Sequence, residues 1–152
     1  MKTLARERDK AEVLRRLRAL RCDSTRRWGR MSAHQMVCHL SDGYRILTGE
    51  RPTELADSRF PRPIMKAVAL YLPLKWPPGI LTTQDLDQDI GGTRPTDFAA
   101  DVAELASLLD RVSLLERRAA ERLHPMFGPM SAAAWMRWAY LHADHHLRQF
   151  GL

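Results

Sequence analysis

Apolar residues recur at helical spacing in several stretches of this chain, separated by segments rich in turn-forming residues. The first stretch, residues 3–21, carries apolar side chains three or four positions apart among charged ones, at Val13, Leu14, Leu17 and Leu20, with Leu4 ahead of them. This spacing places the apolar side chains on one face of a helix and leaves the arginines facing water. Residues 22–30 contain Asp, Ser, Thr and Gly, and we expect them to form a connection.

The second and the fourth predicted helices have the same kind of start signal. Ser32 is followed three residues later by Gln35, which is the pattern of a capping box. The helix that begins there should run to about Thr48, where a glycine ends it. Ser131 stands in the same position before the fourth helix, which should run to about Gln149.

Between these two helices lie an irregular segment and a third helix. Prolines divide residues 53–95, in which only the stretch 64–72 is long enough for a short helix. A connection of this length in a compact domain is usually functional, and it could cover one mouth of the fold. The third helix should begin near Asp97 and continue to about Leu123, and residues 124–129 should break the chain before the fourth helix.

Four principal helices, one long crossover between the second and the third, and no segment with strand periodicity predict an all-α fold, a four-helix bundle. The 152 residues fit a single domain, 1–152. No apolar run approaches the roughly 18 residues needed to span a bilayer, and the charged first residues contain no signal core. We therefore expect a cytoplasmic protein without a membrane partner. Two cysteines are too few for a disulfide framework, so Cys22 and Cys38 are expected to be buried free thiols.

The net charge of +6 is unevenly distributed along the chain. Residues 1–30 contain 11 Lys or Arg against 4 Asp or Glu, a net +7, which leaves −1 for the remainder. Such a basic first helix is more often a solvated face than a DNA-binding element. No aromatic side chain lies among these charges before Trp28, so a stacking surface for single strands is unsupported. The sequence does not favour a nucleic-acid partner.

Histidines on two of the predicted helices are the main candidates for chemistry. His142 and His146 are four residues apart, which lets one helix face offer two imidazoles to a metal ion, and His145 lies three residues from His142. Spacing alone does not choose between these pairs. On the second helix, His34 falls in the first turn, whereas His39 lies two turns in and can point into a bundle.

The metal interpretation has an ordinary alternative, in which these side chains are hydrogen-bonding histidines near helix ends. Neutral imidazoles suit zinc or nickel best, with iron or copper possible. Three protein ligands would leave one position for water or substrate, as in catalytic rather than structural sites.

Two sets of residues resemble a known family, the DinB superfamily of metal-binding four-helix bundles. They are His39-Leu40 on the second helix and His142-x-x-His145-His146-x-x-Gln149 on the fourth. The flanking segments 28–36, 124–130 and 146–151 are similar to an uncharacterised branch of that superfamily, a domain of unknown function. The similarity follows the whole chain in helix order, although residues 53–95 match only in layout.

The resemblance implies a ligand set of one histidine on the second helix and an i,i+4 pair on the fourth. In this chain those residues are His39, His142 and His146. Their supporting neighbours would be Gln35, His145 and Gln149, with Asp42 a weaker candidate. Characterised relatives include transferases and isomerases that use low-molecular-weight thiols such as bacillithiol or mycothiol. On the same grounds we expect a homodimer.

Two functional hypotheses follow. The first is a metal-dependent transferase or hydrolase that acts on a small molecule, and its reaction could use a low-molecular-weight thiol. In this hypothesis the 53–95 connection forms a wall of the substrate cavity through Tyr71, Trp76 and the acidic run 85–89. Simple packing of the two aromatic side chains under a loop is the alternative for that wall. The second hypothesis is a non-catalytic bundle whose histidines are structural or bind metal only for stability. It predicts no cavity beside His39.

Overall fold

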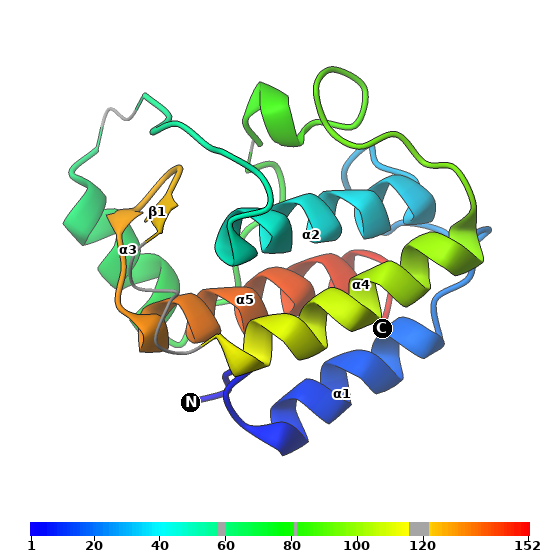
Figure 1. The fold of residues 1–152 in the computed structure, drawn as a ribbon, viewed down its shortest axis with the longest axis horizontal. Coiled ribbons are helices and arrows are strands. Elements are labelled where there is room, and N and C mark those ends of the chain that lie inside the picture. Colours follow the sequence, from blue (N-terminus) through cyan, green and yellow to red (C-terminus); the bar gives the residue numbers. More distant parts are fainter. Residues whose placement is uncertain (58–59, 81, 116–121) are drawn as a thin grey trace.

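The structure is a computed structural model that describes residues 1–57, 60–80, 82–115 and 122–152. Over these ranges the chain is mostly helical, with a two-stranded antiparallel hairpin near one end (Figure 1). The elements in chain order are α1 (Glu7–Arg18), α2 (Ala33–Thr48), α3 (Arg62–Tyr71), the 3-10 helix η1 (Gln84–Leu86), α4 (Phe98–Leu114), β1 (Leu123–His124), β2 (Gly128–Pro129) and α5 (Ala132–Gln149). None of the helices in the described ranges has the length and apolar character needed to cross a membrane.

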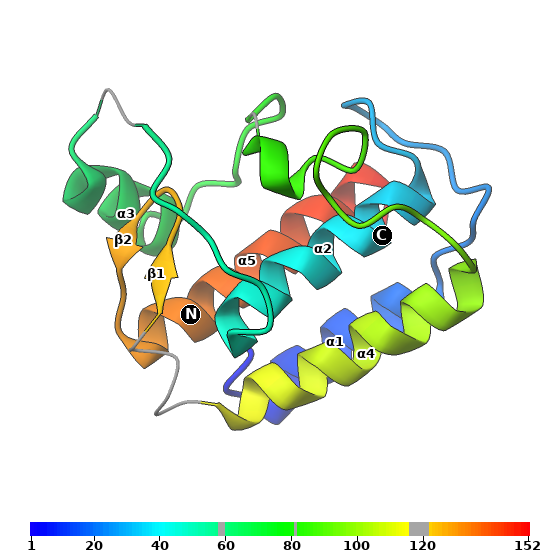
Figure 2. The same ribbon diagram turned by 45° about the horizontal axis from the view of Figure 1, so that its top comes forward.

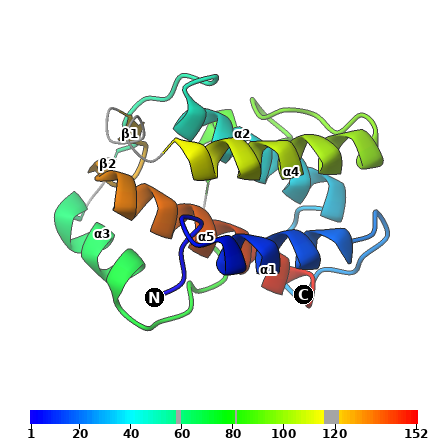
Figure 3. The ribbon, with the colours of Figure 1, turned by 60° about the horizontal axis from the view of Figure 1, so that its bottom comes forward.

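The apolar core lies where α1, α2, α4 and α5 meet. In Figures 1 and 2, α2 lies beside α5 and α1 lies beside α4, and Figure 3 shows α1 packed against α5 as well. Each of these helices contributes almost completely buried side chains, among them Val13, Leu40, Leu108 and Leu147. Burial of one such side chain stabilises the fold by about 1.5–3 kcal/mol, which explains why the helical apolar stripes face one another.

The predicted helix starts are present. Ser32 Oγ accepts a hydrogen bond from the Gln35 N–H at 3.1 Å, and Gln35 Oε1 accepts one from the Ser32 N–H at 2.9 Å, so the capping box is complete. Gly49 ends α2 in the left-handed conformation with φ +83°. Ser131 caps α5 by accepting from the Ala134 N–H at 3.2 Å. These interactions satisfy terminal backbone groups that would otherwise lack partners.

The structure corrects several sequence-based boundaries. The first helix spans Glu7–Arg18 rather than residues 3–21. Leu4 is buried although it precedes this helix, and its backbone N–H donates to the Met136 carbonyl of α5 at 3.1 Å. The third helix, α4, ends at Leu114, and part of its predicted extension, residues 116–121, lies outside the described residues. Cys38 is buried as expected, whereas Cys22 is exposed because it lies in the connection after α1.

A short β-hairpin replaces part of the predicted break at residues 124–129. Strands β1 and β2 pair Leu123 with Pro129 and His124 with Gly128. The turn is held by the His124 side chain, whose Nδ1 accepts from the backbone N–H groups of Met126 and Phe127 at 3.1 and 3.2 Å. Two-residue strands are too short to show strand periodicity, so the sequence pattern gave no sign of them.

The long connection between α2 and α4 passes over α2 (Figure 2), and a buried carboxylate of α2 holds part of it in place. Asp42, which is fully buried, accepts hydrogen bonds from the Thr93 N–H at 2.8 Å, the Thr93 hydroxyl at 2.6 Å and the Gln88 amide at 3.2 Å. The Arg51 guanidinium supplies a counter-charge at 3.1 Å. A buried charge needs such partners, and here they tie residues 88–93 to the helix below.

Candidate metal centre

Three histidines from two helices meet in the interior. His39 projects from α2, and His142 and His146 project from α5, the helix beside it. Their ring centres are 4.8–5.1 Å apart, and one potential ligand atom from each lies within 4.8 Å of the other two. The Nε2 atoms of His39 and His142 are separated by 3.1 Å. All three residues are at most 7% exposed, so this is a buried cluster that could hold a metal ion.

A backbone carbonyl orients His39. The Leu86 carbonyl oxygen in η1 lies 3.0 Å from His39 Nδ1. Because a carbonyl can only accept, Nδ1 carries the proton and the neutral ring keeps a lone pair on Nε2. That lone pair faces the other two histidines, and η1 is thereby connected directly to the centre.

A relay of two hydrogen bonds orients His146 in the same way. The Gln149 amide donates through Nε2 to the Trp28 carbonyl at 2.8 Å, which leaves Gln149 Oε1 to accept from His146 Nδ1 at 3.0 Å. His146 therefore also keeps its lone pair on Nε2. The relay needs a close approach of the loop, since a Cβ on Gly29 would come within 2.5 Å of Gln149 Nε2. Gly29 also has φ +76°, a conformation that favours glycine.

His142 is positioned by packing. Among the described residues its Nδ1 atom is buried without a hydrogen-bond partner. The ring lies 4.7 Å from the Trp138 ring, centre to centre, and fits against Gly43 of α2. A Cβ at Gly43 would lie 3.1 Å from His142 Cε1 and 3.3 Å from Trp138, closer than ordinary van der Waals contact. The absence of a side chain at Gly43 thus makes room for the imidazole.

Burial keeps the cluster neutral at physiological pH. It lowers the pKa of His39, and it lowers the pKa of His142 and His146 well below their ordinary value, with neighbouring histidines adding to the effect. A neutral imidazole is the protonation state that binds a divalent cation. The hydrogen bonds at Nδ1 of His39 and His146 and the pKa shifts therefore favour the same neutral state, which leaves the Nε2 atoms of these two rings unprotonated.

The other residues expected near the site lie in different surroundings. His145 is buried beside the cluster, with its ring 6.0 Å from both Trp28 and Trp76, and it is outside the group of mutually close ligand atoms. Gln35 uses its amide elsewhere: besides the capping box, it donates to Asp89 at 2.7 Å. Asp42 anchors the connection over α2, as described above.

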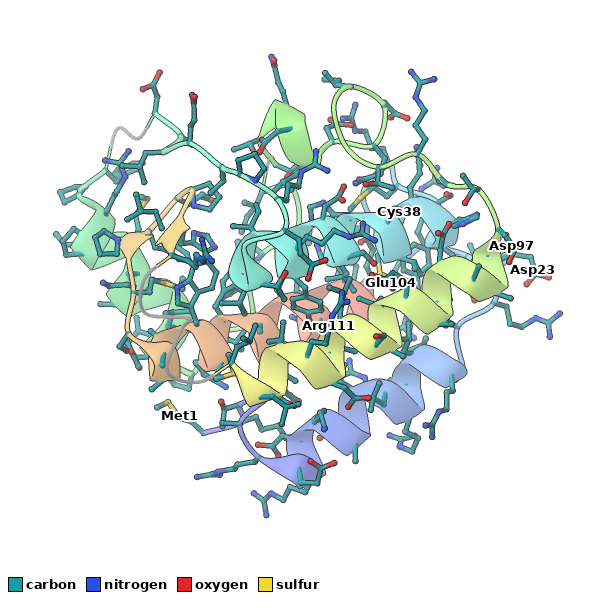
Figure 4. All side chains as sticks on the ribbon, in the orientation of Figure 1. Met1, Asp23, Cys38, Asp97, Glu104 and Arg111 are labelled. Carbon is teal, nitrogen blue, oxygen red and sulfur yellow. The ribbon has the colours of Figure 1, made fainter. Side chains whose placement is uncertain are left out.

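Sequence reasoning missed the groups that orient the ligands. The Leu86 and Trp28 carbonyls are backbone atoms of irregular segments, and no residue type marks them. Gly43 carries no side chain, so its residue type gives no sign that it makes room for an imidazole. A second trio also went unnoticed: Asp101 of α4 accepts from Cys38 at 3.7 Å and lies 2.7 Å from His34 Nε2, and Figure 4 places Cys38 on α2 beside α4.

This second trio connects two helices. The Thr96 N–H also donates to the Asp101 carboxylate at 3.2 Å, so the carboxylate joins α2 to the chain entering α4. Burial, with Asp101 close by, raises the pKa of the Cys38 thiol to about 12 and keeps it protonated. The hydrogen bonds of Asp101 to His34, Cys38 and Thr96 show that this trio joins the two helices.

The buried histidines line a large cavity. Its volume is about 1000 Å³, and its wall includes all three histidines of the cluster. Other parts of the wall come from residues 28–31, from α2, α3 and α5, from the hairpin, and from described residues of the long connection, 74–80 and 82–88. Trp76 takes part in this wall, as the enzyme hypothesis predicted, and its indole N–H donates to the Ala69 carbonyl at 2.8 Å. Of the acidic run 85–89, Asp87 lines the cavity, whereas Asp85, Asp89 and Tyr71 are outside the described lining.

Fold and site together define a mostly helical protein with a buried three-histidine cluster beside a large cavity. Residues 5–151 match the model of one protein family, described as Protein of unknown function (DUF1569), and the chain belongs to that family. Neither the curated proteins nor the solved structures contain a match.

Proposed function

We propose that this protein binds one divalent metal ion, zinc or nickel, through His39, His142 and His146, and that it is a metal-dependent enzyme acting on a small molecule. The observation that carries the proposal is the pair of fixed rings: Nδ1 of His39 and Nδ1 of His146 are both occupied by acceptors, so both Nε2 lone pairs are directed toward the cluster. Hydrogen bonding of the distal ring nitrogen is the usual arrangement of metal-bound histidines.

We further propose that the chain is a member of the DinB superfamily and that α1, α2, α4 and α5 form its four-helix bundle. Two observations support this. These four helices share the apolar core, and the histidine cluster lies between α2 and α5, the second and fourth principal helices to which the resemblance assigns the ligands.

The cavity favours the catalytic hypothesis over a structural metal site. A site that serves only stability is normally closed by four protein ligands, whereas three ligands leave a position free. A non-catalytic bundle also predicts no cavity beside His39, and here the wall of one includes His39 itself. The metal, when bound, would act as a Lewis acid that lowers the pKa of a water or thiol coordinated to it. The DinB resemblance suggests a transferase or hydrolase reaction of this kind.

Metal analysis of tag-free protein by plasma mass spectrometry tests the proposal. Wild type loaded with zinc or nickel and then desalted should retain about one ion per chain. His39→Ala, His142→Ala and His146→Ala should each lose it. His145→Ala is the matched control, because His145 is a buried histidine of the same helix outside the cluster, and this variant should keep its ion. No retained metal in wild type, or full occupancy in the three ligand variants, would overturn the assignment.

A further inference from the structure

The wall of the cavity is mostly apolar, which restricts the ligand that it can take. Helix α3 contributes Ile64 and Val68, and the segment after it contributes Leu74 and Ile80. These four side chains are between 46% and 62% exposed although they belong to the wall of a cavity. Apolar groups gathered in this way usually mark a ligand-binding groove or an interface, because leaving them in water costs free energy.

Some polar groups of the wall are engaged in hydrogen bonds or ion pairs, and others are free to meet a ligand. Arg30 forms an ion pair with Asp87, and Gln88 donates to the buried Asp42 at 3.2 Å. His39 and His146 have their Nδ1 atoms hydrogen-bonded. Lys75 is exposed to solvent. Five buried side-chain atoms of the wall lack a hydrogen-bond partner among the described residues: Thr83 Oγ1, Gln88 Oε1, Trp135 Nε1, His142 Nδ1 and His145 Nδ1. The mostly apolar wall therefore offers a small number of polar partners, which suit one polar end of a ligand.

The position of the histidines adds a second restriction. They are almost fully buried, yet they share the cavity with α3 and with the hairpin residues Met126 and Phe127. A ligand that reaches them from the α3 side must pass along apolar side chains. Ligand cavities commonly combine an apolar body with a few convergent polar groups that fix one end of the ligand, and the histidine cluster is the convergent group here.

We propose that the cavity binds an elongated apolar small molecule with one heteroatom group at its end, and that this group lies at the histidine cluster. The apolar part of the proposal depends only on the cavity. The placement of the head group rests on the proposed metal site. The proposal defines the substrate class by its apolar body, whose burial as hydrocarbon or aromatic surface supplies most of the binding energy.

The apolar part is tested with N-phenyl-1-naphthylamine, a neutral fluorophore that brightens in apolar surroundings. Metal-free and zinc-loaded protein should both bind it saturably at one site per chain. Ile64→Asp should weaken binding at least tenfold, because a carboxylate would stand in the apolar wall. Ile90→Asp is the matched control: Ile90 has the same 61% exposure as Ile64 and lies outside the described lining, so its affinity should equal that of wild type.

The head group is tested with zinc-loaded protein and a series of straight-chain hydroxamic acids from two to eight carbons, followed by calorimetry. Affinity should rise about fourfold for each added methylene that enters the wall. His142→Ala should remove the preference for the hydroxamate, and metal-free wild type should lose the same preference while still binding the fluorophore. Ile64→Asp should flatten the chain-length series.

The outcomes separate the two proposals. Loss of metal binding with retained fluorophore binding would remove the metal site and keep the apolar cavity. Zinc binding with no fluorophore binding and no chain-length dependence would overturn the apolar ligand and leave the metal site standing. Light scattering gives one further overturning result: a wild-type dimer that becomes a 17.5 kDa monomer in Ile64→Asp, with no fluorophore bound by either, would identify the α3 wall as a contact between two copies.

Discussion

Replacing Gln149 by leucine should weaken metal binding although it changes none of the three histidines proposed to bind the metal. The Gln149 amide is 3% exposed and joins His146 Nδ1 to the Trp28 carbonyl through bonds of 3.0 and 2.8 Å. Leucine has a similar size but accepts no hydrogen bond, so the His146 ring loses the group that fixes its tautomer. Loss of such a partner typically costs 10–100-fold in metal affinity, roughly 1.4–2.8 kcal/mol.

The same substitution should also destabilise the metal-free protein. It leaves the buried His146 N–H without an acceptor, which costs about 1–3 kcal/mol. Zinc affinity can be measured by competition with a chromophoric chelator, and the free energy of unfolding by urea titration of metal-free protein. A Gln149→Leu variant that binds zinc within twofold of wild type would refute the orientation argument.

Gln35→Leu provides the matched control, since both glutamines were predicted to support the ligands. Gln35 is bonded to Ser32 and Asp89 instead. Its replacement should lower the free energy of unfolding by about 1–2 kcal/mol, through loss of the capping box and one side-chain bond, and should leave zinc affinity within twofold of wild type. Equal losses of zinc affinity in both variants would mean that the metal responds to general destabilisation.

Three further perturbations test the surroundings of the site. Gly43→Ala should lower zinc affinity at least several-fold, because the new Cβ would lie 3.1 Å from His142 Cε1. Zinc affinity is again measured by competition with the chromophoric chelator. An unchanged affinity would show that the His142 ring can move aside. Burial lowers the pKa of His124 to about 3 from its ordinary 6.5, so between these two values the unfolded state binds a proton that the folded state does not. The free energy of unfolding of the metal-free protein should therefore fall as the pH falls from 6.5 toward 3. This residue contributes up to about 1.4 kcal/mol per pH unit to that loss. In urea titrations between pH 7 and pH 4, His124→Asn, which keeps an acceptor for the hairpin turn, should flatten that slope, and an unflattened slope would assign it to other groups. Asp42→Asn removes the charge that holds Thr93 and Arg51, so it should destabilise the protein by about 3 kcal/mol and expose residues 84–93 to limited proteolysis. If this segment stays intact at the protease dose used for wild type, Asp42 does not anchor it.

The sequence alone determined where most helices lie, because helix formation is governed by short-range signals. The apolar spacing of residues 13–20 placed α1, and the paired Ser32 and Gln35 fixed the start of α2. Ser131 did the same for α5. These features act within one or two turns of the chain, so they are readable without the rest of the fold. The hairpin at 123–129 was missed because a side-chain acceptor, His124, holds a turn with almost no strand around it.

The sequence also supplied the histidines but could not choose among them by spacing. His145 and His146 both pair with His142 on one helix, and the resemblance to a known family favoured His146. The tertiary structure brings His146 toward His39 and leaves His145 against Trp28 and Trp76, because the rotation of α5 about its axis is set by the packing of its apolar face on α1 and α2. A rotation of this kind depends on contacts far apart in sequence.

Only the tertiary structure decided which groups support the histidines and what surrounds them. Gln149 rather than Gln35 reaches a histidine of the cluster, because the Trp28 carbonyl arrives from a loop about 120 residues away in the chain and turns the amide toward His146. The Leu86 carbonyl reaches His39 because Asp42 holds the long connection over α2. The cavity forms where α2, α3 and α5 meet the hairpin and the connecting segments, so it is a property of their assembly. Local residue patterns encode helices and donor atoms, whereas the direction of each lone pair and the shape of the space before it arise from long-range packing.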